Sequence, residues 1–576
     1  MIEKKYFINP QNPIQKQYEA LRAFHVEGVT AKEVEKKYQY SSAHFKKIRF
    51  EFTQALRSKK DNFFQERKRG PKKRSTNTDT IDEVIALRKK NHSIEDIKSI
   101  LSSKDKHISL DTINNVLKDA GFSSLPRRTR AEISNLEMPD NLVAPKSCAL
   151  LPQSEKFSTE RGVGPLLFLP LIDELKIVEA IEAVNFPATT ELSATSTIMS
   201  ILALKLMGTK RYSHDKTWNF DRALGLFAKL NVLPKNATLS SYSYRVTRKM
   251  NRDFLLELSK IFSTSGDFNL DFKTIPHWGD KSVWEKNWSG SKTKVMKSVL
   301  AAIVQHPESG FLSYADAEVK RSKQNDVVLD FVDFWKEGTG QAPKMLVFDS
   351  KFTTYENLNK LDKSEDKIKF LTIRRNGKGL IDAVAKIKDE EWIDIHIDGK
   401  TRKHKDIKVY ENKITMRKYD GELRQLIITQ HGRQDPTFMI TNDFKMPTAD
   451  VVKKYARRWL VEQEIAEQVD FFHINNPSSS IVIKVDFDLT ISLLAHNLYK
   501  VFSNKLAGFE NCRVGTINRN FIENGADITI EKQQICVELR KKTHLPLLMG
   551  TSWFQGPSKI KWLNNMEIYF KGATKS

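Results

Sequence analysis

The sequence predicts a multidomain α/β protein, with small helical modules first and a mixed-sheet domain in the carboxyl-terminal half. Three observations support this fold class. The 576 residues exceed one ordinary domain. Apolar residues recur at helical spacing in the amino-terminal half, whereas strand patterns dominate between residues 268 and 441. The formal net charge is +23, from 94 Lys and Arg against 71 Asp and Glu, which favours a polyanionic partner, nucleic acid ahead of a membrane surface.

Cysteine usage excludes a disulfide framework or a zinc ribbon. Only three cysteines are present, far apart and without paired spacing: Cys148, Cys512 and Cys536. The first residues lack a long apolar segment, and the most apolar stretch, residues 165–171, is short and broken by prolines. We therefore expect an intracellular, soluble protein with no membrane partner.

Residues 1–66 are expected to form a helix-turn-helix module. Three helices are predicted, at residues 14–25, 30–38 and 42–52. Thr30 and Ser42 are candidate N-caps. The last helix would present basic side chains to a DNA groove, namely Lys46, Lys47 and Arg49. The alternative, for this module and the next, is a plain three-helix bundle used for dimerisation.

A second module of the same kind is predicted at residues 79–124, where a capped helix after Ser109 is stopped by Gly121. Its polar face would carry Asn114, Asn115 and Lys118 to base edges or phosphates. The linker at residues 67–78 holds basic residues around a Gly-Pro break: Arg67, Lys68, Arg69, Lys72, Lys73 and Arg74. Such a segment follows a phosphate backbone, enters a minor groove, or serves as a solvated hinge.

The central part divides by composition. Residues 125–162 mix Pro, Arg, Ser and Glu with little periodicity, and we expect an interdomain linker there. Residues 163–262 are predicted to form a helical domain. The mixed-sheet domain would follow in two parts around a β-rich insertion, with closing strands at the end of the chain. The expected bounds are 263–380 and 435–510 for the two parts, 381–434 for the insertion and 511–576 for the C-terminal region.

Two aspartates lie on predicted strands of this domain. Phe268, Leu270 and Phe272 alternate on one face, so Asp271 points the other way in mid-strand. After a hairpin that turns at residues 306–310, the apolar run 345–348 is typical of a buried parallel strand. Asp349 lies at its carboxyl end, where open α/β sheets place ligands.

A third carboxylate follows on a predicted helix, with Glu462 and Glu464 as candidates. The neighbours of Glu462 form a less polar stripe, on which a carboxylate needs a cation partner. The neighbours of Glu464 include Glu467 and Gln468, a solvated pattern. We favour Glu462 as a metal ligand; the alternative is a simple buried pair with Arg458.

The order of these features resembles the DDE transposases of bacterial insertion sequences, in the subgroup with a β-strand insertion. That order is strand-Asp, hairpin, strand-Asp, β-insertion, Thr441-Asn442, then Tyr455-x2-Arg458-x3-Glu462. The resemblance covers about residues 163–545. It implies a ribonuclease-H-like catalytic fold and a bacterial enzyme that binds the terminal inverted repeats of its element. Such an enzyme cleaves double-stranded DNA at the ends and joins the freed 3′-hydroxyls to target DNA, as a homodimer in the synaptic complex.

The resemblance also assigns roles to single residues. Asp271, Asp349 and Glu462 would hold two Mg²⁺ ions, which Mn²⁺ can replace. Tyr455 and Arg458 would contact the transposon-end phosphates. Trp392, in the insertion, is a candidate for stacking on a flipped base; its alternative is an ordinary strand tryptophan.

Two positions complicate this assignment. The signature of the group continues Glu-x6-Lys, and the matching residue here is Val469, so the end contact either differs or is supplied by nearby cations: Lys453, Lys454 or Arg457. Asp280 also competes with Asp271 for the first ligand. We favour Asp271, because Asp280 follows a Pro and a Gly and reads as loop.

Three functions fit these features: a transposase, a DNA-binding regulator that retains the fold without cutting, and another ribonuclease-H-like nuclease such as a junction resolvase or a guide-dependent nuclease. Three clustered carboxylates argue against the regulator, which gains nothing from them. Two modules suited to reading a fixed terminal sequence favour the transposase over the nuclease.

Overall fold

The computed structural model describes Phe7, Pro10 and residues 12–58, 77–122 and 154–573. Short gaps lie at residues 90–93, 103–105, 213–217, 219, 265, 278–283, 291–292, 353, 398–405, 477–480 and 511. The chain divides into two compact units, Met1–Asn77 and Thr78–Ser576. The basic residues expected in the first linker, Arg67 to Arg74, lie outside the described residues, as do residues 125–153 and the competing Asp280.

The described part of the first unit contains the three predicted helices, α2 (Pro13–His25), α3 (Ala31–Tyr38) and α4 (Ser42–Arg57). Thr30 and Glu33 form a capping box at the start of α3. Helix α4 is capped by Ser41, whose hydroxyl accepts from the His44 amide at 3.3 Å, rather than by the predicted Ser42. A small core joins the helices: Ala20, Ala23, Val34, Tyr38 and Phe45.

The second unit begins with α5 (Thr78–Lys89), α6 (Ile94–Ser102) and α7 (Leu110–Asp119). Gly121, with φ +80°, follows α7, as predicted. The apolar side chains of these helices share one core with Ile481 and Ile483 at the start of a much later helix. Phe122 stacks on Tyr244, with ring centroids 5.6 Å apart. This three-helix segment therefore packs directly on the rest of its unit.

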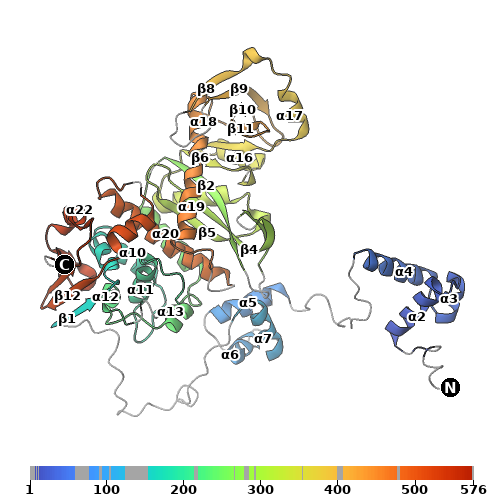
Figure 1. Cartoon of the computed structure of the whole chain (residues 1–576), viewed down its shortest axis with the longest axis horizontal. Helices are drawn as coiled ribbons and strands as arrows, with labels where there is room; N and C mark the ends of the chain where they lie inside the picture. Colours follow the sequence, from blue (N-terminus) through green and yellow to red (C-terminus); the bar gives the residue numbers. More distant parts are fainter. Residues whose placement is uncertain are drawn as a thin grey trace, which may run out of the picture. The chain divides into compact units, whose positions relative to one another are not determined.

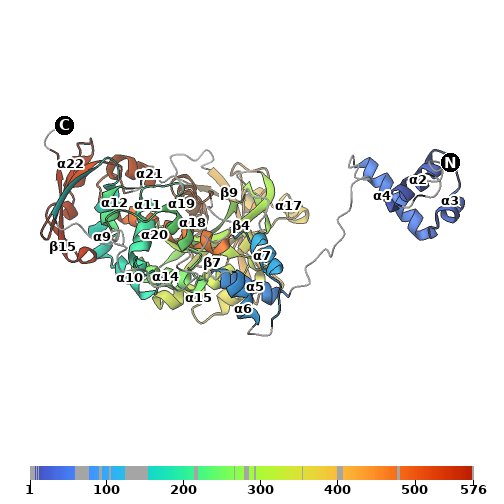
Figure 2. The ribbon, with the colours of Figure 1, turned by 90° about the horizontal axis from the view of Figure 1, so that it is seen from below.

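Helices also fill the next stretch, as expected. They are η1 (Gly164–Phe168), α9 (Leu169–Glu174), α10 (Ile177–Ala183), α11 (Ala194–Leu206), α12 (Arg222–Phe227), α13 (Asn236–Tyr242) and α14 (Arg248–Ile261). Helix α11 is buried on all sides. In Figures 1 and 2 these helices lie between two sheets described below, a five-stranded sheet at the C-terminal end and a ten-stranded sheet. Their side chains belong to the same core as the ten-stranded sheet.

A ten-stranded mixed sheet organises the carboxyl-terminal half. Its strands are β2 (Asp267–Pro276), β3 (Lys286–Ser289), β4 (Lys294–Gln305), β5 (Leu312–Val319), β6 (Met345–Phe348), β7 (Lys369–Arg374), β8 (Ile393–His396), β9 (Asp406–Thr415), β10 (Glu422–Thr429) and β11 (Thr437–Thr441). The order is β3-β4-β2-β6-β7-β11-β10-β9-β8, and β5 pairs with β4. The predicted hairpin at residues 306–310 is confirmed, because β4 and β5 pair antiparallel around it.

The strands expected in a β-rich insertion, β8 to β10, extend this sheet rather than forming a second one. Strand β11 pairs antiparallel with both β7 and β10, which joins them to the main sheet. A separate apolar cluster covers this end, including Val409, Leu426 and Val452. Strands β7 and β11 pair although more than sixty residues separate them, from Arg374 to Phe438. Local patterns in the sequence therefore did not predict that β8 to β10 continue the main sheet.

Helices cover the sheet and carry the remaining functional segments. They are η4 (Arg321–Lys323), α15 (Val327–Thr339), η5 (Ser350–Phe352), α16 (Tyr355–Lys363), α17 (Lys378–Val384), η6 (Asp389–Glu391), α18 (Thr448–Ala456), α19 (Trp459–Asp470) and α20 (Val482–Asn504). Helix α19 contacts β2 and β4, and α20 contacts β5 (Figure 1). None of the helices in the described part of the chain is long and apolar enough to cross a membrane.

The chain ends in a five-stranded sheet of order β1-β12-β13-β15-β14. Its elements are β1 (Ser154–Thr159), α21 (Val514–Ile517), η7 (Asn518–Ile522), β12 (Ala526–Glu531), β13 (Gln534–Leu539), α22 (Leu545–Met549), η8 (Ser552–Phe554), β14 (Ser558–Ile560), η9 (Lys561–Leu563) and β15 (Met566–Gly572). Residues 154–159, expected within a linker, instead form β1 and pair with β12, which lies about 370 residues later. The predicted strands after residue 525 are confirmed.

Candidate active site

Two aspartates lie side by side where the parallel pairing of strands β2 and β6 ends. Strands β2 and β6 pair in parallel, and Leu270 faces Phe348 across them. Asp271, within β2, and Asp349, directly after β6, are the next residues of the two segments, so their side chains lie at the same edge, where the β2–β6 pairing ends. Each carboxylate accepts a hydrogen bond from the backbone amide of the next residue: Asp271 Oδ1 from Phe272 at 2.8 Å, and Asp349 Oδ1 from Ser350 at 2.6 Å.

Glu462, on helix α19, is linked to Asp271 by the guanidinium group of Arg458, which contacts both carboxylates. Arg458, just before the first residue of α19, donates from Nη1 to Asp271 Oδ2 at 3.2 Å and from Nη2 to Glu462 Oε1 at 2.6 Å. The Asp271 and Arg458 side chains are 20% and 16% exposed, whereas Glu462 is 52% exposed. The structure thus brings together all three carboxylates that the sequence singled out.

The electrostatics reflect this crowding. Burial raises the pKa of Asp271, Arg458 opposes the rise, and Glu462 and Asp349 add to it. Burial disfavours the charged form of Arg458, but Tyr455, Asp271 and Glu462 together raise its pKa above the usual value. Burial also raises the pKa of Tyr455 to about 12. Asp271 and Glu462 therefore share one positive side chain, Asp349 adds a third negative charge near Asp271, and the excess negative charge suits divalent cations.

The donor set fits magnesium. Asp271, Asp349 and Glu462 offer only carboxylate oxygens, the hard ligands that Mg²⁺ prefers, and Mg²⁺ keeps several of its own waters. Arg458 Nε is buried and meets no acceptor among the described residues. A phosphate oxygen brought to this edge would satisfy that donor.

Sequence reasoning missed two residues that flank this site. Asn269, buried on β2, donates from Nδ2 to the Arg457 carbonyl at 3.2 Å, which ties the α18–α19 junction to the strand of Asp271. Lys273 lies two residues after Asp271 on the same strand face. Burial lowers its pKa, while Asp470 and Asp271 oppose that change. The period-2 spacing from Asp271 was the signal that could have identified both.

Two of the three cations expected to replace a lysine at Val469 have other partners. Lys454 forms an ion pair with Asp267 at the start of β2. Arg457 donates to the Pro307 carbonyl at 3.4 Å. Lys453 is exposed, and Val469 itself packs against the core. Lys273, in contrast, lies near a carboxylate of the site, since the charge of Asp271 opposes the fall in the Lys273 pKa that burial causes.

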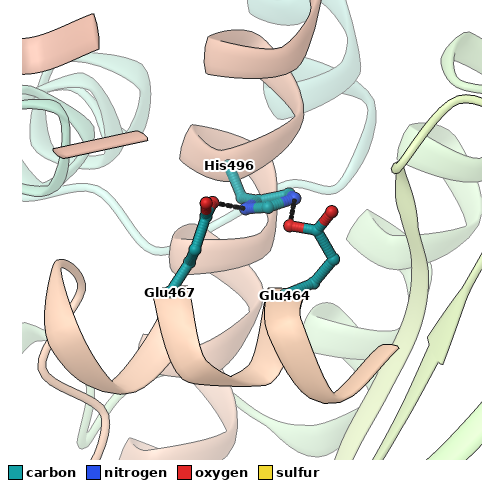
Figure 3. Close-up of side chains that lie close together, drawn as sticks. All are labelled: Glu464, Glu467 and His496. Carbon is teal, nitrogen blue, oxygen red and sulfur yellow. Dashed lines mark ion pairs between the residues drawn. The ribbon is translucent and has the colours of Figure 1, made fainter. Parts of the chain in front are cut away.

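The expected surroundings of Glu462 and Glu464 are wrong. Glu464 and Glu467 are buried, with residue exposures of 8% and 9%, whereas Glu462 is exposed. Helix α20 covers the side of α19 that was expected to be solvated. It supplies two polar partners, His496 (Figure 3) and Lys500. A helix wheel could not anticipate a partner helix some thirty residues further on.

Glu464, Glu467 and His496 form a second acidic cluster, separate in contacts from the first. His496 Nε2 lies 3.3 Å from Glu464 Oε2, and Nδ1 lies 3.8 Å from Glu467 Oε2 (Figure 3). Burial raises the pKa of Glu467 to about 7 and lowers that of His496 to about 3. The two carboxylates face different ring nitrogens, and one ligand atom from each of the three residues lies within 4.8 Å of the others, so the group could hold a metal ion.

The expected DNA-contact residues differ in exposure. Lys46 and Lys47 are exposed on α4, but Arg49 is half-buried, with its guanidinium 3.8 Å from the Phe24 ring centroid. Arg49 is therefore not displayed as predicted, because it packs on an aromatic face. Asn114, Asn115 and Lys118 are exposed on α7. Trp392 is half-buried at the start of β8, with its ring 6.0 Å from that of Tyr410.

Residues 268–498 match a family described as a transposase DDE domain. The match spans Asp271, Asp349 and Glu462 and ends within α20. This part of the chain is a transposase DDE domain. The chain therefore carries the catalytic domain of a DDE transposase, and the two aspartates and the glutamate fall inside it.

Solved structures are more distant. A cryo-EM structure of a piggyBac transposase synaptic complex with hairpin DNA is 11% identical, with a TM-score of 0.34, over 64% of this chain and 81% of that chain. No curated protein matches the chain. The assignment of residues 268–498 as a DDE domain therefore rests on the family match.

Proposed function

We propose that this chain is a DNA transposase that binds the terminal inverted repeats of its element, cleaves at the ends and joins the 3′-hydroxyls to target DNA. The observation that carries the proposal is the meeting of Asp271, Asp349 and Glu462 at one sheet edge inside a transposase DDE domain. We further propose that it acts as a homodimer on paired ends and belongs to a bacterial insertion sequence.

The strand order supports a ribonuclease-H-like catalytic core. Along the sheet the order β5-β4-β2-β6-β7 combines an antiparallel β2-β4-β5 meander with parallel β2-β6-β7 pairing. That arrangement puts Asp271, within β2, and the end of β6 between the antiparallel and the parallel halves of the sheet. Open α/β sheets bind ligands at such switch points.

In the proposed mechanism, Asp271, Asp349 and Glu462 would hold two Mg²⁺ ions, whose positive charge would favour ionisation of an attacking water or 3′-hydroxyl and would stabilise the leaving oxygen. Arg458 keeps Asp271 and Glu462 oriented toward each other, and its unpaired Nε is a donor for a DNA phosphate. Tyr455, whose ring lies 5.7 Å from the Arg458 guanidinium, flanks that phosphate position.

Recognition of the ends is assigned to the two amino-terminal segments as helix-turn-helix modules. Helix α4 would bring Lys46 and Lys47 to the DNA backbone, and α7 would bring Asn114, Asn115 and Lys118 to a groove. The segment with α7 packs on the unit that holds the carboxylates, whereas Met1–Asn77 is a separate unit. We propose that the first module reads DNA independently of the second.

Cleavage of labelled duplexes taken from the DNA that flanks the coding sequence tests this proposal. Wild-type protein should nick one defined position in Mg²⁺ and then join that end to a second duplex. Asp349→Asn and Glu462→Gln should lose both steps and keep end binding, while Asp450→Asn, an exposed acidic residue on α18, should cut normally. Tight end binding without cutting in Mg²⁺ or Mn²⁺ would identify a regulator instead. Cutting that follows DNA structure rather than one terminal sequence would identify another nuclease.

A further inference from the structure

A buried polar cluster lies behind the DDE helix, between α19 and α20. It consists of Glu464, Glu467, His496 and Lys500, and we call it the α19–α20 cluster. Lys500 Nζ lies 2.9 Å from Glu464 Oε1, and the His496 ring lies between the two glutamates (Figure 3). His496 is fully buried, with 0% exposure, so each of its contacts is made inside the protein.

The cluster faces away from the carboxylate site on the same helix. Glu464 follows Glu462 by two residues, which turns it about 200° around the helix axis. Glu462 therefore points toward Asp271 and Arg458, and Glu464 points toward α20. Any contact that fixes Glu464 also fixes the rotation of α19, and with it the direction of Glu462.

Helix α20 is in turn anchored to the strands that carry the site. Asn497 pairs with Leu312 on β5 twice: its Oδ1 accepts from the amide and its Nδ2 donates to the carbonyl, both at 2.9 Å. His496 Nε2 lies 3.2 Å from the Gly310 carbonyl, in the turn before β5. Strand β5 pairs with β4, and β4 pairs with β2, which holds Asp271.

Gly310 leaves room for this contact. Its φ is +72°, which favours glycine, and an added Cβ would lie 3.3 Å from Lys500 Cε and 3.4 Å from Glu464 Oε1. The β4–β5 turn, α19 and α20 thus meet closely at one point. His496 is the side chain that touches all three.

We propose that His496 is a positioning residue for Glu462: through Gly310, Glu464 and Glu467 it sets the rotation of α19 relative to β2. The inference rests on the proposed function, because it assumes that Glu462 and Asp349 bind metal. It does not require that the metal-loaded protein cut DNA.

The alternative interpretation is that the α19–α20 cluster itself binds a metal ion. Glu464 Oε2, Glu467 Oε2 and His496 Nδ1 are buried and meet no hydrogen-bond partner among the described residues. However, Lys500 already supplies a positive charge to Glu464, and the glutamates face opposite nitrogens of one ring. The three residues still offer ligand atoms within 4.8 Å of one another, so metal content is measured alongside the variants.

The test measures Mn²⁺ binding to full-length protein by electron paramagnetic resonance, with end-DNA affinity and melting temperature measured in parallel. Three variants are compared: His496→Leu, which removes both nitrogens, His496→Gln, which keeps an N–H near the Nε2 position, and Tyr499→Phe. Tyr499 lies on the same helix, is fully buried and donates to the Leu206 carbonyl. Its loss controls for a general weakening of α20.

We expect His496→Leu to weaken the Asp349-dependent Mn²⁺ binding about 10-fold or more, as loss of residues that orient metal ligands does. End-DNA affinity should stay within about twofold, His496→Gln should recover most of the Mn²⁺ affinity, and Tyr499→Phe should bind Mn²⁺ like the wild type. Equal losses in His496→Leu and Tyr499→Phe, or no recovery in His496→Gln, would overturn the proposal.

Three further outcomes bear on this inference and on the proposed function. One zinc ion per purified wild-type chain, lost in His496→Leu, would make the cluster a metal site and overturn positioning. Wild-type Mn²⁺ binding that needs Asp349 and His496, without any DNA cutting, would support positioning and reject the transposase activity. Absence of Asp349-dependent Mn²⁺ binding in the wild type would contradict both.

Discussion

Asp271 and Asp349 each follow one member of a paired couple, Leu270 and Phe348, on adjacent parallel strands. This register places two carboxylates at one sheet edge although 78 positions separate them in the chain. Glu462 joins them through Arg458, which contacts both Asp271 and Glu462. The family match over residues 268–498 covers all three.

Arg458→Ala should shift the acid limb of the cleavage pH profile to higher pH. Arg458 lowers the pKa of Asp271 against the effect of burial, so its loss lets that pKa rise further. An opposite charge at this range typically shifts a carboxylate by about 1–3 units, and metal binding needs the ionised form. The measurement is the cleavage rate between pH 6 and 9. Arg457→Ala, at an exposed neighbouring position, is the control; matching profiles in both variants would contradict the account.

Glu467→Gln should stabilise the protein at alkaline pH and not at acid pH. Burial raises the pKa of Glu467 from 4.5 to about 7. A group whose pKa is raised by folding contributes stability below its unfolded pKa, and this contribution is lost as pH rises through the folded value. The cost of ionising Glu467 is on the order of 3 kcal/mol by pH 8, and glutamine avoids it.

Melting temperatures of wild type and Glu467→Gln at pH 5 and pH 8.5 check this prediction. The difference between the two proteins should grow in favour of the variant as pH rises. Other charged groups near Glu467 are Glu464, Lys500 and Arg513. A constant difference across this range would mean that Glu467 ionises normally in the folded protein.

The two amino-terminal modules should contribute differently to DNA binding. Replacing Lys46 and Lys47 with alanine should weaken binding to all sequences alike and reduce the slope of log affinity against log salt by about 2, since each phosphate contact contributes about 0.9. Replacing Asn114 and Asn115 with alanine should lower discrimination between end and random DNA and leave that slope unchanged. Titrations at several salt concentrations distinguish them, and equal slopes in all proteins would contradict the assignment of Lys46 and Lys47.

Local patterns in the sequence predicted much of the site. The apolar run ending at Phe348 identified a buried strand with Asp349 at its end, and alternation identified the orientation of Asp271. The spacing from Tyr455 to Glu462 identified the helix that completes the set. In each case a few neighbouring residues determine the structure, so a single sequence suffices.

Long-range pairing set the limit of prediction. Strand β1 pairs with β12, which lies about 370 residues later in the chain. Strand β11 pairs with β7, so that β8 to β10 extend the main sheet. Glu464 appeared solvated because its buried surroundings come from α20. Asn269 and Lys273 were missed because their roles depend on Arg457 and Asp470, which lie almost 200 residues away.

Exchange of single carboxylates for thiols tests the central claim most directly, that Asp349 and Glu462 ligate the metal. A cysteine thiolate binds the softer Mn²⁺ better than it binds Mg²⁺. We predict that Asp349→Cys and Glu462→Cys lose end cleavage in Mg²⁺ and regain it in Mn²⁺, whereas Asp450→Cys cuts normally in both. Full cleavage by Asp349→Cys or Glu462→Cys in Mg²⁺ would contradict the assignment of these residues as metal ligands.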